Sequence, residues 1–197
     1  MVDTVVKIAA TWLIVDLISG VVHWFEDSYG HPSVPFVGRR ITSPNLLHHF
    51  RPRAFVSNSW YASSQLLLFS CAAALVVAWL LGRLSPMVVL GAVLGANANQ
   101  VHKWSHRTPA ENGPAVGLAQ RLLLIQSPGH HHQHHSGRRN SHYCVLTNLL
   151  NPVLDRFRVW RGLEWVLRQG GLGKRDDDQL LVVVLAGDPG FLDRPRS

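Results

Sequence analysis

The stretch WYASSQLLLFSCAAALVVAWLL, residues 60–81, contains no charged side chain. A helix needs about 20 mostly apolar residues to cross the hydrocarbon core of a bilayer. This stretch meets that requirement on its own. It therefore predicts a transmembrane helix, and the rest of the chain is interpreted around it.

Two neighbouring stretches are candidates for further crossings. Residues 5–22 are apolar apart from Lys7 and Asp16, and residues 86–101 turn polar near their end, at Asn97, Asn99 and Gln100. A fourth stretch, residues 115–126, is interrupted by Arg121 and is too short to span, so it is typical of a re-entrant or interfacial segment. We predict an all-α integral membrane protein with about three transmembrane helices.

Composition supports this class of protein. Hydrophobic residues make up 47% of the chain and charged residues 16%, whereas soluble domains carry about 25% charged residues. The net charge of +7 lies outside the apolar stretches. This pattern indicates contact with anionic lipid head groups and no nucleic-acid binding.

The remaining chain divides into one membrane domain and a tail. We assign residues 1–169 to the membrane domain and leave residues 170–197 as a tail without a role. Residues 158–169 predict an amphipathic helix. That helix either lies among the head groups or packs on the protein's own helices.

Three crossings would bring the histidines to one face of the membrane. They follow the first stretch, precede the second and close the third, and a last cluster follows with no certain crossing between. The opposite face would carry only Lys7 and Arg83. The positive-inside rule therefore predicts that the histidine-rich cap is cytoplasmic, at the inner membrane if the chain is bacterial.

The spacing of the histidines predicts metal binding. His102 and His106 are four residues apart, and side chains so spaced lie about 5–6 Å apart on one face of a helix. His131, His134 and His135 repeat this spacing. The adjacent His48 and His49 would point about 100° apart on a helix and could serve two different ions. His23 is followed four residues later by Asp27, which adds a carboxylate to the same face.

The number of histidines favours two ions. The chain has 12 histidines, more than one structural zinc site of about four ligands requires. Imidazole suits zinc, copper, iron and nickel. Beside lipid, a dinuclear site favours iron and oxygen chemistry, because no side chain can break an unactivated C–H bond.

Four polar residues near the histidines are candidate helpers. Asp16 lies seven residues before His23 and either orients a histidine or makes a helix-packing hydrogen bond. Asn99 poses the same choice, and we favour helix packing. Arg51 and Lys103, together with Arg53, either hold a lipid phosphate or form a solvated basic rim.

Four ordered motifs resemble those of the Kua/CarF-type lipid desaturase family. They are HWFEDSYG at 23–30, HHFRP at 48–52, NQVHKWSH at 99–106 and HHHQHH at 130–135. Tyr143-Cys144 and the stretch from Asn151 to Asp155 match the end of the family pattern, so the resemblance covers residues 16–165. It implies a di-iron centre, with Asp27 as a catalytic residue. The eight histidines that it implies as iron ligands are His23, His48, His49, His102, His106, His131, His134 and His135.

The resemblance also implies a reaction. The favoured one converts a 1-O-alkyl phospholipid, plasmanylethanolamine, to its vinyl ether with O2, and an acyl-lipid desaturase acting near the carboxyl end is the alternative. No flavin, haem or nicotinamide motif is present, so a separate reductase or electron carrier is expected. From other classes, a metal transporter or metal-binding membrane protein and a zinc scaffold stay open.

Overall fold

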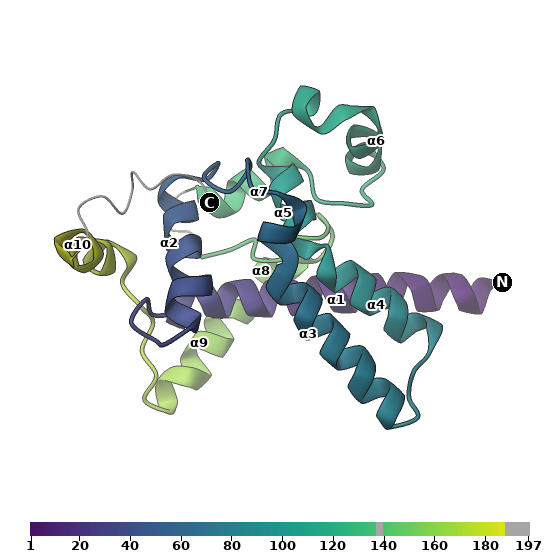
Figure 1. The fold of residues 1–197 in the computed structure, drawn as a ribbon, viewed down its shortest axis with the longest axis horizontal. Helices are drawn as coiled ribbons and strands as arrows, with labels where there is room; N and C mark the ends of the chain where they lie inside the picture. The colour runs from purple at the N-terminus through teal and green to yellow at the C-terminus, as the bar shows by residue number, and fades with distance from the viewer. Residues whose placement is uncertain (137–139, 188–197) are drawn as a thin grey trace.

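The computed structural model describes residues 1–136 and 140–187, and all regular secondary structure within them is helical, as the sequence predicts. Figure 1 shows how the helices are arranged. In chain order the elements are α1 (Val2–Tyr29), the π-helix η1 (Gly38–Thr42), α2 (Ser43–Phe50), α3 (Trp60–Leu80), α4 (Pro86–Ala96), α5 (Ala98–Ser105), α6 (Pro109–Arg121), α7 (Pro128–His135), α8 (Leu150–Arg156), α9 (Val159–Gln169) and α10 (Asp177–Gly187).

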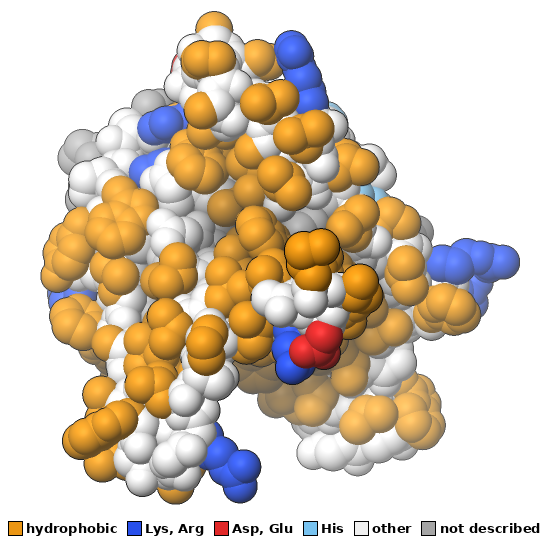
Figure 2. All heavy atoms as spheres, turned by 90° about the vertical axis from the view of Figure 1, so that its right-hand side faces the viewer, with side chains coloured by type: hydrophobic (Ala, Val, Ile, Leu, Met, Phe, Trp, Pro, Cys, Tyr) orange, Lys and Arg blue, Asp and Glu red, His pale blue; other side chains and the backbone are white. Residues whose placement is uncertain are grey.

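Two of these helices are long and apolar enough to cross a membrane. They are α1, with 28 residues, and α3, with 21. Only 17% and 6% of their most apolar windows are buried within the molecule, so they are not the core helices of a soluble fold. Figure 2 looks onto the side that carries the N-terminal end of α1, and hydrophobic side chains cover most of it.

The first and third predicted stretches differ from the helices observed. α1 does not end at Val22 but continues to Tyr29, because no glycine or proline lies between Val22 and Gly30 and the polar side chains of His23, Asp27 and Ser28 are buried inside the molecule. Residues 86–101 are not one helix, because the backbone breaks at Asn97, with φ −99° and ψ 2°. The 11 residues of α4 are roughly 16 Å long, shorter than the hydrocarbon core of about 30 Å.

Small residues let α4 pack closely on its neighbours. α3 and α4 form an antiparallel pair (Figure 1), and α4 also lies against α1. A Cβ on Gly91 would lie 3.7 Å from Thr11 and Val15, and one on Gly95 would lie 3.2 Å from Cys71 Sγ. Close helix approach through glycine is the usual way in which helices associate in lipid.

A non-helical segment, residues 141–149, runs alongside α1 and contacts it between His23 and Asp16; we call it the strap. Tyr143 and Cys144 of the strap are completely buried with Trp24 and Trp160 in one apolar cluster. Gly20 of α1 admits this contact, since a Cβ there would lie 2.5 Å from Cys144 Sγ. The strap is therefore packed against α1 and α9.

The helix predicted at residues 158–169 is α9, and it packs on the protein itself. Leu163 and Leu167 contact the cluster around Trp160. Trp165 and Val166 remain exposed on the other side. Packing on the protein's own helices, one of the two interpretations left open by the sequence, thus accounts for one face of α9.

The stretch at residues 115–126 and the tail complete the fold. α6 is kinked at Gly113 and is followed by a turn, and the exposed leucines of this region are Leu118, Leu122, Leu123 and Leu124. In the tail, Leu180 of α10 is buried against Leu46 of α2. Residues 188–197 lie outside the described part of the chain.

Candidate metal centre

Histidines from four helices meet in two adjacent groups. We call the first the five-histidine group and the second the aspartate group. In each, one nitrogen or oxygen atom per residue lies within 4.8 Å of every other. The five-histidine group contains His48, His102, His106, His131 and His135, and the aspartate group contains His23, Asp27, His49 and His134.

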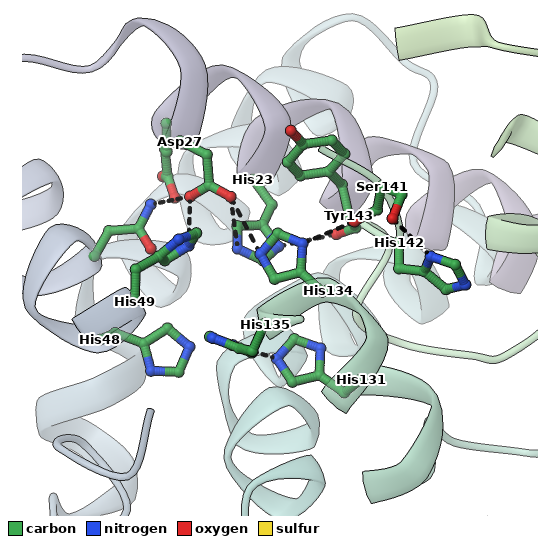
Figure 3. A network of polar contacts seen from close by, with 12 residues as sticks. His23, Asp27, His48, His49, His131, His134, His135, Ser141, His142 and Tyr143 are labelled. Carbon is green, nitrogen blue, oxygen red and sulfur yellow. Dashed lines mark hydrogen bonds and ion pairs between the residues drawn. The ribbon is translucent and has the colours of Figure 1, made fainter. Parts of the chain in front are cut away.

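The helices explain how neighbours in sequence enter different groups. His48 and His49 lie side by side on α2, and each joins a different group, as the 100° turn between adjacent helical residues requires. His134 and His135 of α7 divide in the same way. Figure 3 shows His48, His131 and His135 on one side and His49, His134 and His23 around Asp27 on the other.

The five-histidine group has the spacing of a coordination shell. The Nε2 atom of His102 lies 3.2 Å from that of His48, 2.9 Å from that of His131 and 3.3 Å from that of His106. Each pair of neutral rings can share at most one proton, so facing nitrogens cannot all be satisfied by hydrogen bonds. Metal–nitrogen bonds of about 2.0–2.1 Å would separate neighbouring ligand nitrogens by roughly 3.0–3.4 Å. The residues present therefore fit a metal ion.

All four residues of the aspartate group are buried. Asp27 Oδ1 lies 3.1 Å from His49 Nε2, and Oδ2 lies 3.5 Å from His23 Nε2 and 3.2 Å from His134 Nε2. The three Nε2 atoms and Asp27 Oδ2 are buried without a hydrogen-bond partner. Buried polar atoms without partners are costly, and a shared cation would satisfy all four of these.

Backbone carbonyls fix two of these rings from behind. His23 Nδ1 lies 3.0 Å from the carbonyl of Tyr143, and His134 Nδ1 lies 2.8 Å from that of Ser141. A carbonyl only accepts, so each Nδ1 carries the proton and each Nε2 presents its lone pair to the centre. Asn45 Nδ2 donates to Asp27 Oδ1 over 2.6 Å. Sequence reasoning missed all three partners, because carbonyls of the strap leave no sequence signal and Asn45 lies outside the motifs.

Electrostatics keep the histidines of the five-histidine group neutral. Burial, reinforced by the neighbouring imidazoles, holds the pKa of His48 and His131 well below the ordinary value. The same causes lower the pKa of His106 to about 3. Neutral imidazole is the form that binds metal.

Asp16 does not contact a histidine. Its Oδ1 accepts from the backbone N–H groups of Leu146, at 2.9 Å, and Thr147, at 3.2 Å, and its Oδ2 accepts from the Thr147 hydroxyl. The interpretation that Asp16 orients a histidine directly is therefore wrong. Asp16 is completely buried and binds the strap to α1.

Two of the other predicted helpers have hydrogen-bond partners outside the two groups. Asn99 donates to the carbonyl of Ser63 over 2.7 Å, which is the favoured helix-packing role. Lys103 is 2% exposed and donates to the carbonyl of Asn58, so it is not part of a solvated rim. Arg51 is exposed just after α2.

Two histidines outside the implied eight pair with each other beside the cluster. The ring centroids of His130 and His142 are 5.0 Å apart. His142 Nδ1 lies 2.9 Å from Asp155 Oδ2, and His130 Nε2 lies 3.2 Å from Asn151 Nδ2. These contacts tie α7 and the strap to α8. His132 is exposed and belongs to neither group.

The fold and the site define a helical protein with two helices apolar and long enough to cross a membrane and a histidine-rich cluster that could hold metal ions. Residues 12–177 match the family model of the lipid desaturase domain, and the chain belongs to this family. It is 28% identical to a probable fatty acid desaturase of Acanthamoeba polyphaga mimivirus, over 83% of this chain and 82% of the relative. It is 30% identical to plasmanylethanolamine desaturase of Myxococcus xanthus, over 91% of this chain and 72% of the relative.

The similarity to a plant relative covers a smaller share of that relative's length. The chain is 32% identical to the chloroplastic fatty acid desaturase 4 of Arabidopsis thaliana, over 80% of this chain and 49% of that protein. No solved structure matches the chain. The protein is thus a lipid desaturase, an oxidoreductase that works on lipid in association with a membrane.

Proposed function

We propose that this protein is a di-iron desaturase that converts the alkyl chain of a 1-O-alkyl phospholipid, plasmanylethanolamine, to a vinyl ether. The observation that carries the proposal is the meeting of eight histidines and one carboxylate in two adjacent groups. The name and the 30% identity of the Myxococcus xanthus relative favour this substrate. An acyl lipid desaturated near its carboxyl end is the second candidate, supported by the chloroplastic relative.

Each group would hold one iron ion. The five histidines of the first group and the three histidines and Asp27 of the second are the proposed ligands. Ligands of this kind suit iron, among other first-row metals. When bound, the iron pair supplies the oxidising power that no side chain has.

The atoms of the proposed reaction balance with dioxygen and an electron donor. The lipid loses one hydrogen atom from each of two neighbouring carbons and gains a double bond. Reducing O2 to two water molecules takes four electrons and four protons, of which the lipid supplies two of each. A separate reductase or electron carrier supplies the other two electrons, with protons from water.

The protein's own residues would prepare this chemistry. The carbonyls of Tyr143 and Ser141 hold the rings of His23 and His134 with Nε2 inward. Asn45 helps to hold Asp27 by donating to its Oδ1. We also propose that Asp27, with its two oxygens facing three imidazoles, balances the charge of the bound ion.

The place of the cluster relative to the apolar helices favours a bond close to the glycerol. His23 lies near the end of α1, and the apolar α3 and α4 extend away from the cluster (Figure 1). If α1 and α3 span a bilayer, a phospholipid beside them would have its head group near the cluster and the ends of its chains far from it. The carbons nearest to the iron would then be the first ones of the chain.

We propose that the cluster faces the cytoplasm and that α4 and the start of α5 together make a third crossing. The basic residues gather on the cluster side. After replacement of Cys71 and Cys144, single cysteines at Ser85 and Ser136 should react with an impermeant reagent from opposite sides. If the reagent labelled both cysteines from the same side of the membrane, the third crossing would be refuted.

Two other functions fit the cluster less well. A transporter would distribute its ligands along a path through the bilayer, whereas these eight histidines gather in one place. A zinc scaffold needs about four ligands.

Lipid analysis tests the proposal. Cells that express the protein with a working reductase and an alkyl-ether phospholipid should accumulate an acid-labile vinyl ether lipid. A new double bond only in the middle of a chain would contradict both the substrate and the geometry. A double bond early in an acyl chain would instead establish the second candidate.

A further inference from the structure

A charged pocket lies beside the five-histidine group. It has a volume of about 410 Å³ and is lined by Arg53, Val56, Ser57, Arg107 and Glu111. These residues come from the loop after α2 and from the first turn of α6 with the residues before it. We call it the arginine pocket.

One arginine of this pocket is held in place by its neighbours. Arg53 Nη2 donates to Glu111 Oε1 over 2.6 Å, and Nη1 donates to Glu111 Oε2 over 3.3 Å. Glu111 Oε2 also accepts from the Thr108 backbone N–H at the start of α6. Arg53 therefore offers a pre-oriented guanidinium, and the charge of Glu111 is already balanced.

The second arginine gives the pocket its surplus of positive charge. Arg107 donates from Nη2 to the carbonyl of Val56 over 3.1 Å. Among the side chains that the structure describes, no carboxylate forms a salt bridge with Arg107. Lys103 provides a third cationic side chain near the pocket. Its buried ammonium donates to the carbonyl of Asn58, the residue after the pocket-lining Ser57.

The pocket is coupled to the candidate metal ligands. Arg53 Nη1 donates to the backbone carbonyl of His106 over 2.7 Å. Near the end of α6, Leu118 within the helix and Leu122 just after it are exposed. Exposed leucines on the helix that begins at a basic pocket are typical of a segment at the boundary between head groups and lipid chains.

We infer that the arginine pocket binds the phosphate of the substrate lipid's head group. Guanidinium groups match phosphate in geometry and charge, and the pocket is large enough for a phosphate ester. Binding there would hold the head group beside His106, because Arg107 follows His106 in the sequence and Arg53 donates to the His106 carbonyl. This inference rests on the proposed desaturase function and deepens it, because it makes a phosphate group a requirement for recognition.

Equilibrium binding to the metal-free, full-length protein in neutral detergent tests the inference. The probes are a short-chain alkyl phospholipid, the same lipid without its phosphate group, and inorganic phosphate. Arg107→Gln should weaken binding of the phospholipid about tenfold and leave binding of the phosphate-free lipid unchanged. Arg107→Lys should restore part of the loss, and Arg121→Gln, at the exposed last residue of α6, should change neither.

Kinetics separate this role from a merely structural one. In the iron-loaded enzyme, Arg107→Gln should raise KM for the phospholipid and leave kcat nearly unchanged. Equal binding of both lipids by the unaltered protein, or binding of inorganic phosphate as tight as that of the phospholipid, would overturn the inference. A phosphate preference without any vinyl ether product would instead contradict the proposed reaction and leave the pocket assignment standing.

Discussion

The aspartate group and the five-histidine group are built in different ways. All four residues of the aspartate group are buried, and the rings of His23 and His134 are held from behind by carbonyls of the strap. In the five-histidine group, His106 and His135 are partly exposed. The Nδ1 atoms of His48, His131 and His135 have no hydrogen-bond partner.

The two groups are held in place by different kinds of contact. Contacts between distant parts of the chain hold the aspartate group, whereas helical spacing holds much of the five-histidine group, through the pairs His102/His106 and His131/His135. The enclosed group is therefore expected to be rigid. The more open group is the side from which dioxygen and lipid can approach.

The largest effect should follow from removal of a ligand in either group. His134→Ala and His131→Ala should each abolish desaturation, because each leaves an incomplete set of nitrogens around an ion. Product formation in membranes would be measured against protein abundance. The matched control is His132→Ala, an exposed neighbour on the same helix, which should keep most of the activity. Full activity in the His134 variant would remove the aspartate group from the mechanism.

A loss of charge should distinguish the groups. Asp27→Asn preserves the size of the side chain but removes the negative charge that faces three histidines. We expect the iron content to fall from about two ions to about one per chain, with loss of activity. Elemental analysis of the purified variant measures this, and retention of both ions would show that Asp27 is not needed to hold metal.

Weakening of the strap should affect the aspartate group first. Asp16→Ala leaves two N–H groups and a hydroxyl of the strap without their acceptor, at an expected cost of about 2–4 kcal/mol in unfolding free energy. Thermal unfolding in detergent measures the loss, with Asp3→Ala on the exposed start of α1 as control. Equal stability of the two variants would contradict the anchoring role of Asp16.

The smallest effect is expected at Asn45. Asn45→Ala removes one hydrogen bond to Asp27 while the proposed ligands stay in place. Such outer partners typically change activity or metal affinity by about 10–100-fold, and we expect the lower end because three imidazoles still surround the carboxylate. Activity measured over a range of iron concentrations would show whether added metal restores the rate. Unchanged activity at every concentration would mean that Asn45 has no part in holding Asp27.

The sequence predicts those parts of this site that depend on local spacing. Pairs such as His102 and His106 are visible because helical geometry alone brings them together. The division of His48 and His49 between two groups follows from the same geometry. The apolar stretch at residues 60–81 predicted α3 because length and composition suffice for a spanning helix.

Features that depend on the tertiary structure escaped prediction. The break at Asn97 is one such feature, because it depends on contacts of the folded chain. Asn97 Nδ2 donates to the carbonyl of Val93, and Asn97 Oδ1 accepts from Trp60 Nε1 of α3. The sequence leaves two roles open for Asp16, orienting a histidine or making a packing hydrogen bond, and cannot point to its partner Thr147, 131 positions away. The strap carbonyls have no side-chain signature at all.

The most direct test of the two-group account is the metal content of the purified, full-length protein. We predict about two iron ions per chain, and about one after His49→Ala, with the five-histidine group still filled. Elemental analysis together with the absorption spectrum of the metal centre would make the measurement. A single zinc ion per chain, unchanged by His49→Ala, would contradict the account.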